Sequence, residues 1–291
     1  MKQNNLKEPK VSVLVPIRNG ANYIPRKIEE LNSITYDNIE ILISVNQSTD
    51  NSFEKVQELV TGSERYKIFI QEELLEISQN FAFLVNRAKG DFVVFTAVDD
   101  VLSSTFISEA LNMLKLDGDA IAVVASSQYE LNSHGPEPVQ LILSGERLER
   151  LLEFIENARV SHALFYCLAQ RDLVKRFANE YPKEFIGRDW VFNIELLLQG
   201  RVLSTKRDTI IFGERGTSRG NDALRINQKG LLKFLPYLPM ARRVLQIALR
   251  ERDEVLFPLV KFALNLLIGN VRRNLRILAE EVIKLLKKSK F

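Results

Sequence analysis

Val11-Ser12-Val13-Leu14-Val15-Pro16 opens the stretch that decides the fold. A helical pattern over residues 24–33 follows this apolar run, and a second apolar run, Ile39-Glu40-Ile41-Leu42-Ile43-Ser44-Val45, comes next. Short runs of apolar and β-branched residues favour buried strands, and a helix between two of them is typical of a parallel βα unit. The stretch therefore predicts the first two strands of a parallel sheet.

The same alternation continues along the first half of the chain. We expect further strands at residues 66–70, 92–96 and 120–126, and helices at residues 52–60, 81–88 and 105–116. The fold class is therefore α/β, a mostly parallel sheet flanked by helices. Ligands in such sheets bind outside the carboxyl ends of the strands, which directs attention to the loops there.

The second half carries fewer strand signals. After a turn-like loop at residues 132–138 we expect helices near residues 146–156 and 189–199, a strand near 209–212, and helices from Leu231 onward. This pattern predicts a main α/β domain over residues 1–225 and a C-terminal α-helical extension over residues 226–291.

Composition and charge narrow the class of protein. The chain is 46% hydrophobic and 26% charged, which is typical of a globular protein. Its single cysteine, Cys167, excludes an intramolecular disulfide, and the first ten residues lack an apolar signal-peptide segment, so we expect a cytoplasmic protein. From Lys229 onward 14 basic and 5 acidic residues give a charge of +9, against a net +3 for the whole chain.

Three polar loops follow predicted strands and should open on one edge. They are residues 16–20, residues 46–50 and residues 97–100, the last of which ends in Asp99 and Asp100. Two adjacent carboxylates at the end of an apolar strand are costly unless a cation compensates them, and Mg²⁺ or Mn²⁺ bind few carboxylates together with substrate phosphates. The alternative is that both acids cap the helix that follows.

The order of these motifs resembles that of GT-A glycosyltransferases of family 2. The resemblance runs over roughly residues 10–220, through residues 11–19, Ser48-Thr49-Asp50, and residues 88–91 leading to Asp99-Asp100. It implies that the first two loops hold the nucleotide, and that an Asp-x-Asp element holds the ribose and the metal bound to the diphosphate.

Residue by residue, the resemblance assigns nucleotide-sugar binding to Pro16, Arg18, Asn19, Asn46, Ser48, Asp50, Asp99 and Asp100. Three positions depart from the family pattern. Val45 replaces an Asp that hydrogen-bonds the base, with Asn46 as the nearest polar substitute, and Arg18 replaces an aromatic residue but can stack on a base. Ala97 replaces the first Asp of the motif, which leaves Asp99, with Asp100 beside it, to bind the metal.

A second landmark implied by the resemblance is an acid at the start of a late helix. Asp189 fits it and would act as the general base on the acceptor hydroxyl, in a reaction that inverts the anomeric centre. The alternative is an acid that interacts with the helix dipole. Trp190 beside it would either stack on an acceptor ring or belong to the core. Glu195 is a weaker candidate for the base.

The loop over residues 213–222 resembles the segment that closes over the donor in this family. Its Arg215 and Arg219 would neutralise the departing diphosphate, unless the loop is an ordinary solvated one.

The C-terminal helices combine apolar residues at helical spacing with basic ones. We expect them to pack on the catalytic domain, to form a homodimer, or to lie on the inner face of a membrane where acceptors are lipid-linked. A nucleic-acid partner is not expected, because no aromatic stacking platforms lie between the basic residues.

The resemblance predicts an inverting glycosyltransferase that moves a sugar from a nucleotide-diphosphate sugar to a hydroxyl of a glycan or lipid-linked acceptor, in polysaccharide biosynthesis, with Mn²⁺ or Mg²⁺. Two alternatives stay open: a sugar nucleotidyltransferase, and a degenerate transferase kept as a membrane-associated assembly partner. Residues 16–20 lack the glycine-rich, basic loop of the former. The departures at Val45 and Ala97 are the reason to consider a degenerate transferase.

Overall fold

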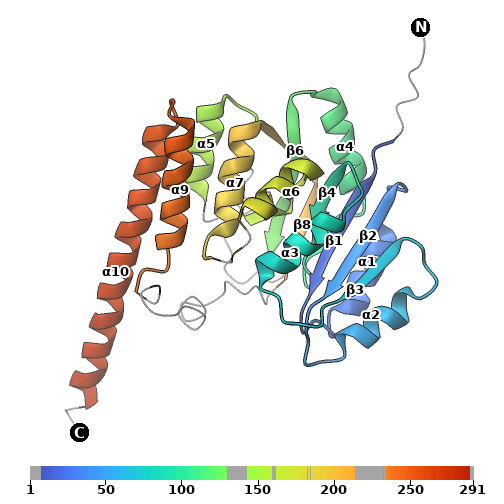
Figure 1. Cartoon of the computed structure of the whole chain (residues 1–291), viewed down its shortest axis with the longest axis horizontal. Coiled ribbons are helices and arrows are strands. Elements are labelled where there is room, and N and C mark those ends of the chain that lie inside the picture. The colour runs from blue at the N-terminus through green and yellow to red at the C-terminus, as the bar shows by residue number, and fades with distance from the viewer. Residues whose placement is uncertain are drawn as a thin grey trace. The chain divides into compact units, whose positions relative to one another are not determined.

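The computed structural model describes residues 8–129, 143–158, 162–181, 183, 185–213, 232 and 234–288. The chain forms two compact units. Unit 1 comprises Met1–Glu184 and Phe192–Arg215, and unit 2 comprises Phe185–Val191 and Gly216–Phe291. Figure 1 shows the ribbon of the whole chain.

A sheet organises unit 1. Its first half contains β1 (Val11–Ile17), β2 (Ile39–Val45), β3 (Tyr66–Ile70) and β4 (Phe92–Phe95). Strand β1 lies between β2 and β4, β2 also pairs with β3, and all three pairings are parallel. The carboxyl ends of these strands therefore point to one edge of the sheet, as the sequence predicts.

The second half of the sheet is mixed. It contains β5 (Val101–Leu102), β6 (Ala120–Tyr129), β7 (Leu168–Gln170) and β8 (Arg201–Phe212). Strand β7 is antiparallel to both β4 and β6, β8 is parallel to β6, and β5 is antiparallel to β8. The order is β3-β2-β1-β4-β7-β6-β8-β5. The predicted α/β class with a mostly parallel sheet is confirmed.

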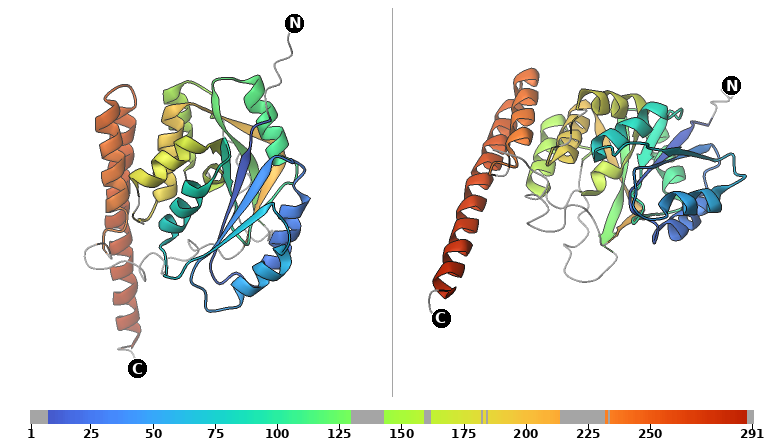
Figure 2. Two further views of the ribbon diagram at one scale, coloured as in Figure 1. Left: turned by 45° about the vertical axis from the view of Figure 1, so that its right-hand side comes forward. Right: turned by 60° about the horizontal axis from the view of Figure 1, so that its bottom comes forward.

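Helices cover both faces of the sheet. They are α1 (Ile24–Ser33), α2 (Ser52–Val60), α3 (Ile77–Arg87), α4 (Phe106–Leu116), α5 (Arg147–Asn157) and α6 (Arg171–Glu180), with a short 3₁₀ helix at His162–Tyr166. Helices α1 and α2 lie beside each other, and α3 packs against α6 on the opposite face (Figure 2). This arrangement follows from right-handed crossovers between parallel strands.

Several elements differ from the sequence prediction, and β5, β7 and the short 3₁₀ helix were not predicted at all. Helix α3 begins at Ile77, four residues before the predicted start, because Glu76 and Gln79 form a capping box there. Strand β8 is longer than residues 209–212, and the segment over α6 was not predicted as a helix. Helix α6 carries the buried apolar residues Val174, Phe177 and Ala178 at helical spacing, so its signal was present in the sequence and was missed.

Apolar side chains of β1 and β2 form the centre of unit 1. Val13, Leu14, Ile41 and Leu42 are fully buried. Strands covered on both faces need such continuous apolar runs, which is why the opening stretch of sequence is so informative.

Unit 2 is helical. It contains α9 (Leu238–Glu251) and α10 (Leu256–Lys288), which pack against each other. Helix α7 (Arg188–Gln199) has its first residues in unit 2 and the rest in unit 1.

Candidate active site

Hydrogen bonds join the loop after β1 to the loop after β2. The backbone N–H of Asn19 donates to Ser48 Oγ at 3.1 Å, and the side-chain Oδ1 of Asn19 accepts the Thr49 N–H at 2.8 Å. Asn19 adopts a left-handed backbone conformation (φ 51°), which asparagine tolerates better than most residues. The predicted nucleotide residues Asn19 and Ser48 thus belong to one structural unit.

Asp50 connects the same two loops to helix α2. One carboxylate oxygen accepts the Ala21 N–H at 3.0 Å, and the other accepts the Ser52 N–H at 3.1 Å. Loss of hydration around the carboxylate acts to raise the pKa of Asp50, but the hydrogen bonds from Ser52 and Ala21 outweigh it and hold the pKa below its ordinary value. Asp50 is therefore an ionised, exposed residue at this edge of the sheet.

Asn46 is a brace between two backbone segments. Its Nδ2 donates to the Leu75 carbonyl at 2.8 Å, and its Oδ1 accepts the N–H groups of Leu75 and Gln47, both at 3.0 Å. Its side chain is buried. The amide group predicted to substitute for a base-binding Asp is therefore already engaged with the backbone.

Three other predicted positions differ in exposure. Val45 is 2% exposed and belongs to the core, so it offers no polar group to a base. Pro16 is partly exposed at the end of β1. Arg18 is exposed, and its guanidinium makes no hydrogen bond within the part of the chain that the structure describes, so it is available to a ligand.

The loop after β4 reaches the loop after β1. A Cβ on Gly20 would lie 3.0 Å from the Val98 side chain, so these loops are in close contact. Asp99 is partly exposed here, whereas Asp100 is 6% exposed. The three polar loops predicted from sequence therefore meet at one edge of the sheet, with Asp99 as the accessible acid of the pair.

Asp100 is held from the end of β8. Its Oδ1 accepts the Gly213 N–H at 3.0 Å, while its buried Oδ2 has no hydrogen bond of normal geometry within the described residues. Burial raises the pKa of Asp100 to about 6; the Gly213 N–H, Lys27 and Tyr166 oppose the rise and the charge of Asp99 adds to it. A buried carboxylate with an unused oxygen lies beside the accessible one.

Gly213 is required by this close approach. A Cβ on Gly213 would lie 2.5 Å from the Asp99 carbonyl oxygen and 2.8 Å from Asp99 Oδ2. Any side chain at this position must displace the loop that carries the two acids, so the identity of residue 213 controls where Asp99 lies.

A buried lysine forms hydrogen bonds with the same loop. Lys27 of α1 is 1% exposed, and its Nζ donates to Thr96 Oγ1 at 2.8 Å and to the Asp100 carbonyl at 2.6 Å. It forms an ion pair with Glu30 at 2.7 Å, and Glu30 Oε1 accepts the Leu102 N–H at 3.0 Å. Burial lowers the pKa of Lys27 and raises that of Glu30. This pair, which we call the Lys27–Glu30 brace, fixes both ends of the acidic loop.

Asp99 and Asp100 are suited to a metal ion that takes most of its ligands from a bound substrate. Within the described residues, no group of three or more His, Cys, Asp or Glu side chains is close enough to form an all-protein metal site. Asp99 is partly exposed, and the buried Oδ2 of Asp100 has no hydrogen bond of normal geometry in the part of the chain that the structure describes. Two carboxylates with phosphate oxygens suffice for Mg²⁺ or Mn²⁺, so this donor set is compatible with a metal that arrives with a diphosphate.

Removing one member of the Lys27–Glu30 brace should destabilise unit 1. We expect Lys27→Met to lower the free energy of unfolding by about 3–5 kcal/mol, because Glu30 would be left buried without a counter-charge. Urea unfolding followed by circular dichroism measures this. The double variant with Lys27→Met and Glu30→Leu should recover most of the loss. A double variant that is no more stable than Lys27→Met would contradict the importance of the pair.

The raised pKa of Asp100 predicts a pH-dependent effect on stability. Folding favours the protonated acid, so the stabilisation is complete below about pH 4 and is lost as the pH rises through about 6. We expect Asp100→Asn, which does not ionise, to gain up to about 3 kcal/mol relative to the native chain between low and neutral pH. Urea unfolding of both proteins across this range tests it, with exposed Asp91→Asn as the control. A difference that does not change with pH would contradict it.

Asp189 lies in the first turn of α7, as predicted, and its side chain is partly exposed. Gly187 precedes the helix with φ 82°, and a Cβ there would lie 2.2 Å from Met240 Sδ. Trp190 stacks on Phe262 of α10, with ring centroids 6.1 Å apart. This packing accounts for Trp190 without an acceptor, whereas the role of Asp189 as a base stays a prediction.

Arg215 and Arg219, predicted to contact the departing diphosphate, lie outside the described residues.

Sequence reasoning missed the residues that support the acidic loop, namely Lys27, Glu30, Thr96 and Gly213. Lys27 had a detectable signal, since it falls between Ile24 and Leu31 on the face of α1 that the helical period assigns to the core. A charged residue in such a position needs a buried partner. Gly213 had no local signal, because its role depends on a loop more than a hundred positions earlier in the chain.

Comparison with known proteins agrees with this geometry. Residues 12–181 match the family model described as "Glycosyl transferase family 2". A curated relative, "Glycosyltransferase GlyG" of Streptococcus pneumoniae, is 30% identical over 116 residues, which is 40% of this chain and 38% of the relative. The chain thus matches well under half the length of that relative.

Solved structures share the fold. Staphylococcus aureus TarS 1-349 in complex with UDP-GlcNAc matches with a TM-score of 0.63 at 17% identity, over 81% of this chain and 66% of that one. The mannosyltransferase PcManGT from Pyrobaculum calidifontis, in complex with GDP-Man and Mn²⁺, matches with a TM-score of 0.55 at 14% identity, over 95% and 81% respectively.

Proposed function

Because the chain belongs to glycosyl transferase family 2, we propose that it transfers a sugar from a nucleotide-diphosphate sugar to an acceptor hydroxyl with inversion at the anomeric carbon. One observation carries this proposal. The loops after β1, β2 and β4 meet at one edge of the sheet, where the accessible acid Asp99 lies beside the buried acid Asp100.

The nucleotide would bind across the first two loops. The exposed Arg18 would stack on the base or bind a phosphate, and Asp50 would present an ionised carboxylate beside Asn19 and Ser48. Asn46 would act by holding the end of β2 in place, since its amide is engaged with Leu75. Pro16 would contact the nucleotide through its partly exposed ring.

Asp99 would hold the divalent metal on the diphosphate, with Mn²⁺ or Mg²⁺ as the ion. When bound, the metal supplies positive charge that stabilises the departing diphosphate. Asp100 would assist through its carboxylate, and the Lys27–Glu30 brace would keep the loop in position. The Mn²⁺ bound to PcManGT supports this choice of ion.

Asp189 would take the proton from the acceptor hydroxyl. Its place in the first turn of α7 leaves it partly exposed, and a carboxylate is a common general base. A base on the side opposite the leaving group gives a single displacement, which inverts the anomeric centre. The acceptor would be a glycan or a lipid-linked sugar, in a polysaccharide pathway.

Calorimetry tests the donor site directly. We expect the whole chain to bind UDP-GlcNAc or GDP-mannose, and to bind it at least about tenfold more tightly with Mn²⁺ present. Val45→Asp, which restores an acid at the end of β2, is a useful second protein. It should alter the choice of base without changing the dependence on Mn²⁺, because residue 45 is on β2, which does not pair with β4, the strand before the acidic loop.

Absence of binding to any nucleotide-diphosphate sugar would overturn the proposal and favour a degenerate transferase. Binding of the donor without formation of product would indicate that the acceptor tested is the wrong one. Proton NMR of the first product formed then distinguishes inversion from retention, since retention would exclude the single-displacement role of Asp189.

A further inference from the structure

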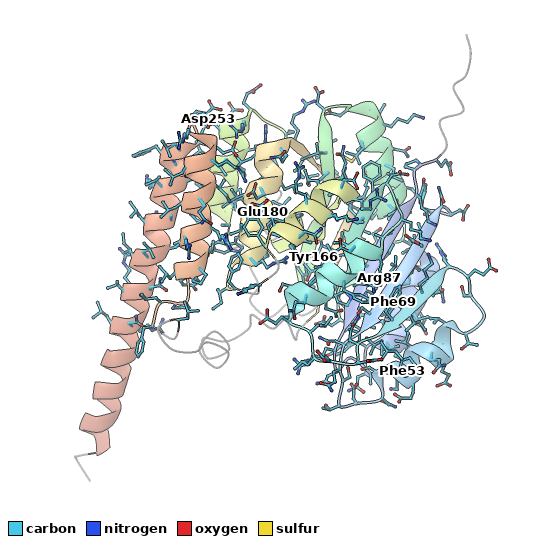
Figure 3. All side chains as sticks on the ribbon, in the orientation of Figure 1. Phe53, Phe69, Arg87, Tyr166, Glu180 and Asp253 are labelled. Atoms are coloured by element: carbon cyan, nitrogen blue, oxygen red, sulfur yellow. The ribbon has the colours of Figure 1, made fainter. Side chains whose placement is uncertain are left out.

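Helix α10 packs on α9 through one apolar face. The buried residues of α9 are Met240, Ala241, Val244, Ile247 and Ala248, and those of the first part of α10 include Leu259, Phe262, Ala263 and Leu266. The chain reverses direction near Asp253 (Figure 3), whose carboxylate accepts the Val255 N–H at 3.1 Å. This contact explains why α9 and α10 form a stable pair.

A second apolar face of α10 has no protein covering it within the described residues. It consists of Phe257 (75% exposed), Leu264 (52%), Ile268 (47%), Val271 (55%) and Leu275 (62%). Successive residues lie seven, four, three and four positions apart, so they form a single line along the helix. We call this line the outer stripe. Scattered exposed apolar residues are normal, but a continuous row on the side away from the packed face indicates an interaction surface.

The charges beside the outer stripe have one sign. Between Leu256 and Ala279 the helix sequence contains Lys261, Arg272, Arg273 and Arg276 and no acidic residue. Lys261, Arg272 and Arg276 are exposed. Lys261 follows Phe257 by four residues and Arg272 follows Ile268 by four, so these cations lie along the edge of the stripe.

We propose that the outer stripe docks on an anionic phospholipid surface, with Phe257, Leu264, Ile268, Val271 and Leu275 inserted between headgroups and Lys261, Arg272 and Arg276 against lipid phosphates. Apolar side chains flanked by cations on one helix face suit the interface of an anionic membrane. No helix in the described part of the chain has the length and apolar character needed to span a bilayer. In this proposal, α10 lies along the membrane surface.

The charge pattern favours lipid over a second copy of the chain. Two outer stripes packed together, parallel or antiparallel, would bring cations of one copy next to cations of the other, since the segment from 256 to 279 offers no acid to pair with them. Such like-charge contacts oppose association. Anionic headgroups supply the missing negative charge.

Vesicle flotation with the whole chain tests the proposal. Vesicles of phosphatidylcholine alone are compared with vesicles of phosphatidylcholine and phosphatidylglycerol at about 2:1, and we expect about 100-fold tighter binding to the mixed vesicles. A variant with Lys261, Arg272 and Arg276 changed to Gln should lose most of this preference. A variant with Leu264, Ile268 and Leu275 changed to Gln should bind at least about tenfold more weakly.

A matched control removes exposed apolar residues elsewhere. Leu59 in α2 and Leu116 in α4 are 45% and 89% exposed, and changing both to Gln should leave vesicle binding unchanged. Circular dichroism verifies that every variant is folded. We expect all of them to fold, because the substituted side chains are exposed. Sedimentation velocity without lipid is run in parallel on the native and stripe variants.

Equal binding to both kinds of vesicle, or none, would overturn the proposal. So would a native dimer in lipid-free buffer that becomes monomeric in the stripe variant, because the stripe would then belong to a second copy. Vesicle binding does not depend on donor binding, so this result is independent of the proposed transfer activity.

Discussion

Replacing Asp99 by asparagine is expected to lower glycosyl transfer by at least about a thousand-fold. Asp99 is the accessible acid of the pair, and an amide keeps its shape but removes the charge that would hold the metal on the diphosphate. Donor binding should also lose its dependence on Mn²⁺. Release of nucleoside diphosphate over a range of Mn²⁺ concentrations, together with calorimetry, measures both effects.

The control for Asp99→Asn is Asp91→Asn. Asp91 is an exposed acid just before β4, at the opposite end of the same strand, and its carboxylate accepts a hydrogen bond from the backbone N–H of Lys10. We expect nearly full transfer by that variant. Normal turnover by Asp99→Asn, with its fold shown to be intact, would rule out the assignment of the metal to this residue.

Replacing Asp189 by asparagine is expected to reduce the rate of transfer by about 10²- to 10⁴-fold while donor binding stays the same. The amide cannot accept the proton of the acceptor hydroxyl, whereas the nucleotide loops are unchanged. The loss should therefore fall on kcat rather than on the dissociation constant of the donor. Single-turnover measurements with preloaded donor separate the two quantities.

Glu195→Gln serves as the comparison for Asp189→Asn. Glu195 is on the same helix, and its carboxylate accepts the Tyr181 hydroxyl at 2.8 Å, which indicates a structural role. We expect a small decrease in stability and little change in transfer. If Glu195→Gln abolished transfer and Asp189→Asn did not, the general base would be Glu195.

The parallel half of the sheet was predictable because its signals are local. Residues 11–16, 39–45 and 66–70 are short apolar runs, and the observed strands β1, β2 and β3 match them closely. Strands buried on both faces must be apolar throughout, so their sequence carries the pattern without help from the rest of the chain. The family resemblance based on the loops after these strands is confirmed by the family model.

The mixed half of the sheet was harder to predict. Strand β7 is three residues long and β5 only two, and both exist because neighbouring strands supply their hydrogen bonds. Most of β8 was missed because its polar residues, such as Lys206, obscure the apolar alternation. Such strands are defined by their partners rather than by their own residues.

Part of the candidate site was likewise predictable from local sequence, and part was not. The sequence alone determined which residues are candidates, because Asp99, Asp100, Asn19 and Asp50 lie directly after strand signals, where a parallel sheet places its ligands. It also determined that Val45 and Ala97 depart from the family pattern.

Only the tertiary structure decided what holds the acidic pair. The Lys27–Glu30 brace comes from a helix about seventy positions before Asp100, and the Gly213 N–H from a strand end more than a hundred positions after it. The structure also distinguished the two acids, because burial raises the pKa of Asp100 whereas Asp99 stays accessible. Burial and contacts between distant segments arise only on folding, so no local pattern of residues encodes them.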